Sequence, residues 1–221
     1  MNRDDVRLDW QRSDRLGIRE AIWGQHKTVD QIVNILEAFE LRDQPALVTR
    51  VDAAKAQSVL SRCSCLRLRY EARARCLTLG TPPPVRYGLG KVMVLSGGTS
   101  DLPVAAEAQL ALRWHGIDVE LLLDVGVAGL HRLLDQLPRL RPSSVLIACA
   151  GMEGALPTVL AGLLPQPVIG VPVSVGYGVS AGGRAALDGM LASCAPGLAV
   201  VNIDNGYGAA MVALRILQMG G

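Results

Sequence analysis

Residues 91–101 read KVMVLSGGTSD, and this stretch decides which fold we expect. The apolar run Lys91–Leu95 is typical of a strand that is buried on both faces of a sheet. A glycine-rich turn, Ser96–Asp101, follows at once, and a helical pattern extends from Leu102 to about Trp114. A strand, a glycine turn and a helix in this order predict the first unit of a parallel α/β domain.

The same order recurs four times towards the C-terminus, which predicts a repeated β-α pattern. Further strands are expected at Val119–Val125, Ser144–Ala148, Pro167–Val173 and Leu198–Ile203, and helices at Leu130–Leu134, Leu156–Leu163 and Gly208–Leu217. Right-handed crossovers between parallel strands leave helices on both faces of the sheet. We therefore expect a doubly wound, mainly parallel five-stranded α/β sheet of the flavodoxin or Rossmann type.

Three consecutive prolines, Pro82–Pro84, mark a change of composition and predict a stiff spacer. We expect a small α+β domain at 1–80, a proline-rich linker at 81–90 and the α/β domain at 91–221. The first domain has an amphipathic helix capped by Thr28, a second helix at Ala53–Leu60, and strands at Ala46–Thr49 and Leu66–Tyr70.

Composition argues against several classes of partner. A formal charge of +2 is too small to favour nucleic acid or an anionic membrane, and the arginines between Arg62 and Arg75 fit a solvated strand face better. The charged start and the lack of a long apolar run predict a cytoplasmic protein. Neither the five cysteines nor the three histidines have the spacing of a disulfide framework or metal site, so no metal ligands are predicted.

The turn after the first strand is the first candidate site. Backbone N–H groups and hydroxyls here can surround a phosphate, and the helix that follows favours negative charge. The spacing is neither the dinucleotide fingerprint nor a Walker loop, and the alternative is an ordinary capped turn. The candidate phosphate-binding residues are Ser96, Gly97, Gly98, Thr99, Ser100 and Asp101.

Two later turns fall at the same edge of the expected sheet. In the second, Gly151 and Met152 precede Glu153. This glutamate either interacts favourably with the dipole of the following helix or acts as a general acid or base. In the third, Gly176, Tyr177 and Gly178 provide either a ring that covers a ligand or a loop anchor that only packs. Ligands of open parallel sheets bind at this edge, so all three turns are expected to contribute to one site.

Cys194 lies where a helix ends before the fifth strand, on the opposite edge of the sheet from these turns. A free cysteine is most often a small buried apolar residue. Because Cys194 and the turns lie on opposite edges of the sheet, Cys194 is too far from the turns within one chain to attack their ligand. A neighbouring subunit that brings its cysteine to the site removes this objection.

The motifs LSGGTSD, AGMEGALP and VIGVPV resemble the aminoimidazole ribonucleotide (AIR) carboxylase/mutase family of purine synthesis, known as PurE. This resemblance covers about Lys91 to Leu217. Two departures count against that activity. Ala155 stands where the family has a histidine, and DVGVAGLHR replaces its Ser-Ala-His-Arg motif.

A closer resemblance is to the LarB family of nickel-pincer nucleotide cofactor synthesis. It is carried by VGYG, LDGML, SCAPG and VVNIDNGYGA between Val175 and Ala209, and by LDWQR, KT, IL and TR between Leu8 and Arg50. His26 replaces a glycine or similar residue before Lys27. The resemblance implies carboxylation at pyridinium C5 of nicotinic acid adenine dinucleotide. Hydrolysis of the phosphoanhydride then gives pyridinium-3,5-biscarboxylic acid mononucleotide and AMP.

The resemblance assigns a role to each candidate. Cys194 would add to the ring and make C5 nucleophilic, Glu153 would act as base or assist hydrolysis, and Asp101 would lie near the ring. Asn205 would then be a candidate substrate contact, and the N-terminal Arg12, Arg15, Lys27 and Arg50 would be candidates to bind the other phosphate or a carboxylate of the acidic dinucleotide. CO2 or bicarbonate would be co-substrate, and Mg2+ would arrive with the substrate phosphates.

A homo-octamer, or another homo-oligomer with active sites between subunits, is also implied. The alternatives are AIR carboxylase or N5-carboxyaminoimidazole ribonucleotide mutase activity, and a nucleotide-binding protein without catalysis.

Overall fold

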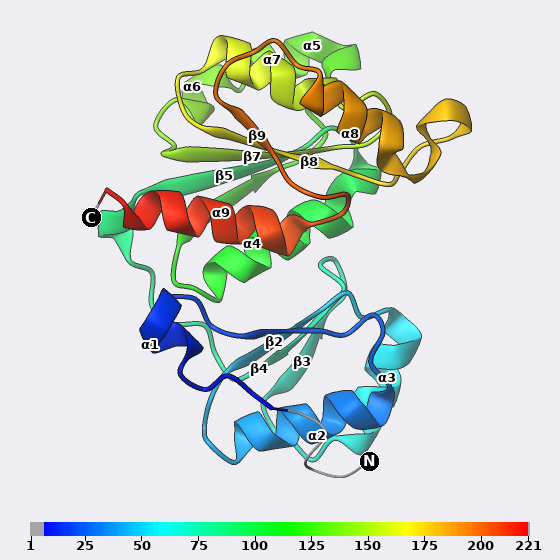
Figure 1. Ribbon diagram of the computed structural model, residues 1–221, viewed down its shortest axis with the longest axis vertical. Coiled ribbons are helices and arrows are strands. Elements are labelled where there is room, and N and C mark those ends of the chain that lie inside the picture. Colours follow the sequence, from blue (N-terminus) through cyan, green and yellow to red (C-terminus); the bar gives the residue numbers. More distant parts are fainter. Residues whose placement is uncertain (1–6, 221) are drawn as a thin grey trace. The chain divides into compact units, whose positions relative to one another are not determined.

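The structure is a computed structural model that describes residues 7–220; the charged stretch 1–6, part of the cytoplasmic prediction, lies outside the described residues. The chain divides into two compact units, Met1–Pro83 and Pro84–Gly221 (Figure 1). None of the helices described within residues 7–220 combines the length and the apolar character that crossing a membrane requires.

The C-terminal unit is built on five parallel strands in the order β6-β5-β7-β8-β9. The strands are β5 (Lys91–Ser96), β6 (Asp118–Leu122), β7 (Val145–Ala150), β8 (Val168–Pro172) and β9 (Leu198–Val200). This is the flavodoxin-type order, and it confirms the predicted fold class. Strands β5, β7 and β8 are almost wholly buried, because helices cover both faces, which explains their continuous apolar runs.

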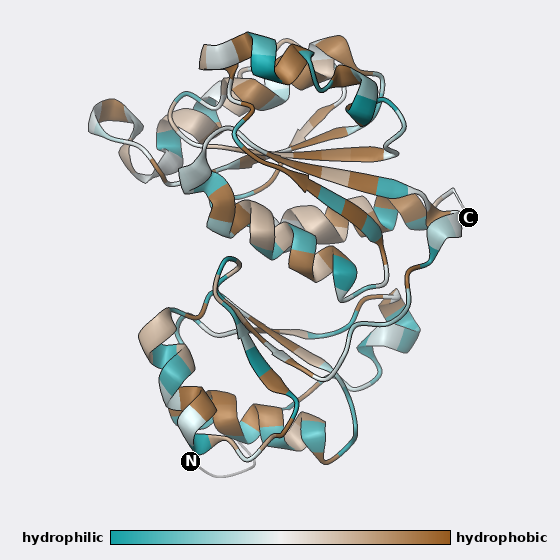
Figure 2. Ribbon diagram, turned by 180° about the vertical axis from the view of Figure 1, so that it is seen from behind, coloured by the Kyte–Doolittle hydropathy of each residue, from teal (hydrophilic) through white to brown (hydrophobic). Residues whose placement is uncertain are grey.

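Two layers of helices enclose this sheet (Figure 1). One face is covered by α4 (Leu102–Arg113) and α9 (Gly206–Gln218), which pack against each other. The other carries α5 (Leu130–Leu134), α6 (Leu137–Leu140), α7 (Ala155–Leu163) and α8 (Arg184–Leu191), which share one apolar core with the strands. Figure 2 shows the strands of this sheet as mainly hydrophobic.

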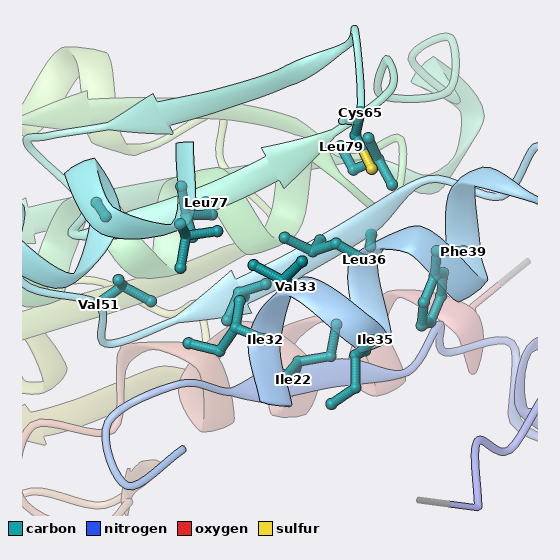
Figure 3. Packing of buried hydrophobic residues seen from close by; sticks show 14 residues of the cluster. Ile22, Ile32, Val33, Ile35, Leu36, Phe39, Val51, Cys65, Leu77 and Leu79 are labelled. Atoms are coloured by element: carbon teal, nitrogen blue, oxygen red, sulfur yellow. The ribbon is translucent and has the colours of Figure 1, made fainter. Parts of the chain in front are cut away.

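The N-terminal unit has a mixed sheet in the order β1-β2-β4-β3. Its strands are β1 (Ala21–Trp23), β2 (Ala46–Thr49), β3 (Leu68–Glu71) and β4 (Cys76–Leu79), and its helices are α1 (Arg12–Leu16), α2 (Val29–Glu40) and α3 (Ala53–Arg62). The predicted capping box at Thr28 is present, with Gln31 as its second residue. The buried side of α2 packs on the strands in a core of aliphatic residues around Phe39 (Figure 3).

Candidate active site at the strand ends of the C-terminal unit

A pocket of about 290 Å³ lies at the carboxyl ends of β5 and β7. The order of the sheet reverses between these two neighbouring strands, since β6 lies beyond β5 and β8 lies beyond β7. Chain connections leave a crevice at such a reversal, and ligands of open α/β sheets bind there. Its walls are Gly97, Gly98, Ser100, Asp101, Gly126, Val127, Ala128, Ala150, Gly151, Met152, Glu153, Ala155, Leu156 and Val175.

The Asp101 carboxyl group lies between the first two turns. Its Oδ2 accepts a hydrogen bond of 2.8 Å from the N–H of Gly98, and a Cβ on Gly151 would lie 3.4 Å from its Oδ1. Burial raises the pKa of Asp101 above the ordinary value, against the backbone N–H groups of Gly98, Gly151 and Gly97, which lower it. Negative charge on Asp204 acts in the same direction as burial. The pocket therefore contains a buried acid with a weakened tendency to ionise.

Close backbone contacts fix the pocket walls. A Cβ on Gly126 would lie 2.5 Å from the carbonyl oxygen of Gly97, and one on Gly151 would lie 2.2 Å from that of Val175. The N–H of Met152 donates to the same Val175 oxygen at 3.1 Å. Met152 also has a φ of 54°, an uncommon conformation for a residue with a side chain. Glycines and one strained residue thus hold four turns together at the pocket.

The structure brings together seven of the predicted site residues, namely Gly97, Gly98, Ser100, Asp101, Gly151, Met152 and Glu153. Glu153 is exposed to solvent at this wall. Ser96 and Thr99 do not line the pocket. Ser96 is fully buried, and its Oγ accepts a hydrogen bond of 3.2 Å from the N–H of Asp124. The sequence pattern missed the wall at Gly126–Ala128, since only the strand order brings it beside β5.

The third turn contributes Val175 to the pocket, whereas Gly176, Tyr177 and Gly178 do not line it. Tyr177 is 77% exposed and Val179, just beyond it, is 95% exposed. In Figure 1 the segment after β8, coloured amber, extends away from the body of this unit. The tyrosine therefore covers nothing within the described chain.

The segment after β9 is held in place by hydrogen bonds. Asn205 caps α9, because its Oδ1 accepts from the N–H of Gly208 at 2.9 Å. Asp204 Oδ1 accepts from the N–H of Ser174 at 2.8 Å, which ties this segment to the third turn. The buried Glu107 of α4 accepts from the N–H of Tyr207 at 3.0 Å. Asn205 therefore has a structural role as the cap of α9, and it does not line the pocket.

Cys194 is an exposed free thiol in the loop between α8 and β9. It therefore precedes its strand, whereas the pocket lies where strands end, and it is not among the pocket residues. Ser193 fixes the loop, since its Oγ accepts from the Oγ1 of Thr158 at 2.9 Å and from the N–H of Ala195 at 3.2 Å. The loop presents the thiol to solvent in an ordered setting.

The four predicted N-terminal cations do not line one pocket together. Lys27 lines a pocket of about 470 Å³. Arg15 forms an ion pair with Asp9 at 2.6 Å. Arg12 is half-buried, and Arg50 follows β2 with a φ of 55°. Of these four side chains, only Lys27 lines that pocket.

The described part of the chain contains no ready-made metal cage. Within residues 7–220, no group of three or more His, Cys, Asp or Glu side chains is placed to hold one metal ion. In the C-terminal pocket, Asp101 and Glu153 are the only acidic residues among the described lining residues. Two carboxyl groups are too few to enclose a magnesium ion, which needs six oxygen ligands, so most ligands would have to come from water or a bound phosphate.

Comparisons with known proteins agree with this division. Residues 91–221 match the model of the AIR carboxylase family, and residues 2–81 match that of the LarB/PurE-like N-terminal domain. An uncharacterized protein of Methanocaldococcus jannaschii is 38% identical over 219 residues, covering 97% of this chain and 84% of that protein.

Relatives with a named activity match a little over half of the chain. The N5-carboxyaminoimidazole ribonucleotide mutase of M. jannaschii is 36% identical over 135 residues, which are 58% of this chain and 79% of the mutase. A crystal structure of a variant of Treponema denticola PurE2 matches with a TM-score of 0.48 and 23% identity, over 59% of this chain and 81% of that one. By its matched domains, the chain belongs to the AIR carboxylase family and carries a LarB/PurE-like N-terminal domain.

Proposed function

We propose that the chain is an enzyme that carboxylates C5 of the pyridinium ring of nicotinic acid adenine dinucleotide and hydrolyses its phosphoanhydride. The products are pyridinium-3,5-biscarboxylic acid mononucleotide and AMP. The observation that carries the proposal is the chemistry of the pocket: Asp101 and Glu153 line it, and the described walls include no histidine. Ala155 stands in the wall at the position of the mutase family's imidazole, and a methyl group transfers no protons.

The reaction needs a nucleophile, because a pyridinium carbon is too electron-poor to attack CO2. In the proposal, the Cys194 thiolate forms a C–S bond with the ring, and the electron pair moves to make C5 nucleophilic. C5 then forms a C–C bond with CO2. A base, Glu153 or Asp101, takes the C5 proton, the C–S bond breaks and the aromatic ring and the thiolate are restored. Water cleaves the P–O–P linkage in a separate step.

Asp101 fits the proton-transfer part of this scheme. Burial raises its pKa above the ordinary value, and a carboxyl group that holds its proton more readily is better suited to proton exchange with the substrate. The turn at Gly97, Gly98 and Ser100 borders the same pocket and would hold the mononucleotide phosphate. CO2 or bicarbonate is the co-substrate, and Mg2+ would neutralise the diphosphate as it breaks.

The position of Cys194 makes oligomerisation part of the proposal. The thiol precedes β9, whereas Asp101 and Glu153 follow β5 and β7, so one subunit would supply the carboxyl groups and a neighbour the cysteine. We propose a homo-oligomer, an octamer by family resemblance, in which this exchange is symmetric.

The decisive experiment combines the full chain with nicotinic acid adenine dinucleotide, labelled bicarbonate and Mg2+, followed by mass spectrometry. Labelled biscarboxylic mononucleotide together with AMP is expected. Cys194→Ser should abolish carboxylation and retain dinucleotide binding. The control Cys63→Ser, at a half-buried thiol of the N-terminal unit, should leave activity unchanged. Absence of both products from the wild-type chain would refute the proposal.

Co-expression tests the shared site. Cys194→Ser and Glu153→Gln chains are each expected to be inactive, and mixed oligomers should regain about a quarter of the activity through random pairing of intact residues. A double variant mixed with itself is the control and should stay inactive. Mixed oligomers without activity would place both residues on one subunit.

Mutase activity is the second candidate, favoured by the names of the relatives that match residues of the C-terminal unit. Conversion of N5-carboxyaminoimidazole ribonucleotide by the chain, with no product from the dinucleotide, would establish it. Binding of either ligand without turnover, unaffected by Cys194→Ser, would instead indicate a non-catalytic nucleotide-binding protein.

A further inference from the structure

The N-terminal unit has a pocket of its own, between β1, the start of α2 and the segment at Arg7 and Leu8. Its volume of about 470 Å³ lies in the range of small-molecule sites. All of its walls belong to the N-terminal unit: Arg7, Leu8, Glu20, Ala21, Ile22, Trp23, His26, Lys27, Gln31 and Ile35. The reaction steps proposed above use none of these residues, and Lys27 was predicted only as a substrate contact.

One wall of this pocket offers flat rings. Trp23 lies on β1, at the edge of the sheet, and its side chain is 53% exposed. Its ring meets that of His26 edge to face, with centroids 4.9 Å apart and planes at 86°. An exposed indole at a pocket wall is a stacking surface for a heteroaromatic base. The apolar floor, Ile22 and Ile35, belongs to the core of the unit (Figure 3).

The pocket also contains two positively charged side chains, Arg7 and Lys27. Within residues 7–220, neither side chain forms an ion pair with another residue. The acid in the wall, Glu20, is already engaged, since its Oε2 accepts from the N–H of Asp9 at 2.7 Å. Two cations that form no ion pair within residues 7–220, together with the aromatic ring in the same pocket wall, attract a ligand that combines an anion with a flat ring.

The loop that connects Trp23 and Lys27 is held rigidly. Gly24 has no room for a side chain, because a Cβ there would lie 2.6 Å from Cγ2 of Val51. The Nζ of Lys55 donates to the carbonyl oxygens of Gly24 at 3.1 Å and Gln25 at 2.7 Å. The loop between Trp23 and Lys27 is therefore preorganised, which lowers the entropic cost of binding.

We propose that this pocket binds a nucleoside 5′-monophosphate, with the base on Trp23 and the phosphate between Arg7 and Lys27. The base stacks on an exposed ring, and the phosphate neutralises cations that no described residue pairs. This inference does not depend on the proposed reaction, because it concerns binding at a site within the N-terminal unit alone.

The test is calorimetric titration of the full-length chain with AMP, without bicarbonate, supported by tryptophan fluorescence. We expect saturable binding with quenching of Trp23, and affinities at least tenfold lower for adenosine and for ribose 5-phosphate. Lys27→Gln should weaken AMP binding about tenfold or more, since a charge-assisted contact is lost. Arg73→Gln, which removes one exposed charge in the turn between β3 and β4, is the matched control and should bind normally.

Trp23→Leu should lower the affinity about tenfold, and Trp23→Phe should retain most of it, because an aromatic face remains. Melting curves of each variant separate lost contacts from lost folding. Equal affinities in Lys27→Gln and Arg73→Gln would overturn the inference, since AMP would then bind elsewhere. Equal affinities for AMP and ribose 5-phosphate would overturn the stacking of the base.

Discussion

Replacing Gly151 by alanine tests whether backbone contact between two turns builds the C-terminal pocket. The new Cβ would lie 2.2 Å from the carbonyl oxygen of Val175, about 1 Å less than an ordinary carbon–oxygen contact. Two backbone segments must therefore separate. The φ of Gly151 is not in the left-handed region, so this contact rather than backbone strain sets the outcome.

The expected cost follows from those contacts. Overpacking costs about 1–3 kcal/mol. The separation also weakens the hydrogen bond from the N–H of Met152 to Val175, at 3.1 Å, which contributes about 1 kcal/mol. The C-terminal unit should lose about 2–4 kcal/mol in total, which is about 1–2 M in the midpoint of urea unfolding.

The assay is urea unfolding followed by the fluorescence of Trp114, which is buried in the C-terminal unit. Trp10 and Trp23 are replaced by Phe in every sample, so that only this unit is observed. Gly162→Ala is the matched control. Gly162 lies inside α7 with open space around a Cβ, so alanine there should stabilise the unit by about 1 kcal/mol.

Activity gives the second measurement. A displacement of about 1 Å between the pocket walls should lower the rate about a hundredfold. AMP release from the dinucleotide should therefore fall in Gly151→Ala and stay constant in Gly162→Ala. A Gly151→Ala chain with the wild-type midpoint would refute the reasoning, because the turns would then separate without cost.

Three further predictions concern other contacts. Gly206→Ala places a Cβ 2.3 Å from the carbonyl oxygen of Val104, so α4 and α9 must separate and urea unfolding should show a loss of about 1–3 kcal/mol. Because burial raises the pKa of Asp101, stability should fall as pH rises from about 4 through the raised value, and Asp101→Asn should flatten that part of the pH–stability curve. Thr28→Ala removes the cap that accepts from the N–H of Gln31 and should cost the N-terminal unit about 1 kcal/mol, measured by thermal unfolding.

Local patterns determined the elements of the C-terminal unit. The apolar run Lys91–Leu95 became β5, which extends one residue further to Ser96, and the helix expected from Leu102 to about Trp114 ends at Arg113. Strand ends were less well predicted, since β9 stops at Val200 rather than Ile203. A strand that is buried on both faces has a continuous apolar sequence, so its presence can be predicted. Where it ends depends on how far the adjacent strand pairs with it.

Short strands of the N-terminal unit were missed for a related reason. β1, Ala21–Trp23, has only three residues, which are too few to show a pattern of alternating polar and apolar residues. β4, Cys76–Leu79, is buried throughout and therefore lacks such an alternation. Such segments become strands only through distant partners, as when β2 pairs with both. Local propensity is too weak to select them.

The sequence by itself determined the α/β class, the cap at Thr28 and the chemistry of the turns at Gly97 and Gly151. Only the tertiary structure decided which turns meet, because the order β6-β5-β7 depends on pairing between strands far apart in the chain. That order placed Gly126 against Gly97 and Asp101 among backbone N–H groups, and it left Cys194 away from the pocket. The sequence specifies which residues each turn contains, but the distances between the turns depend on how the strands of the sheet pair.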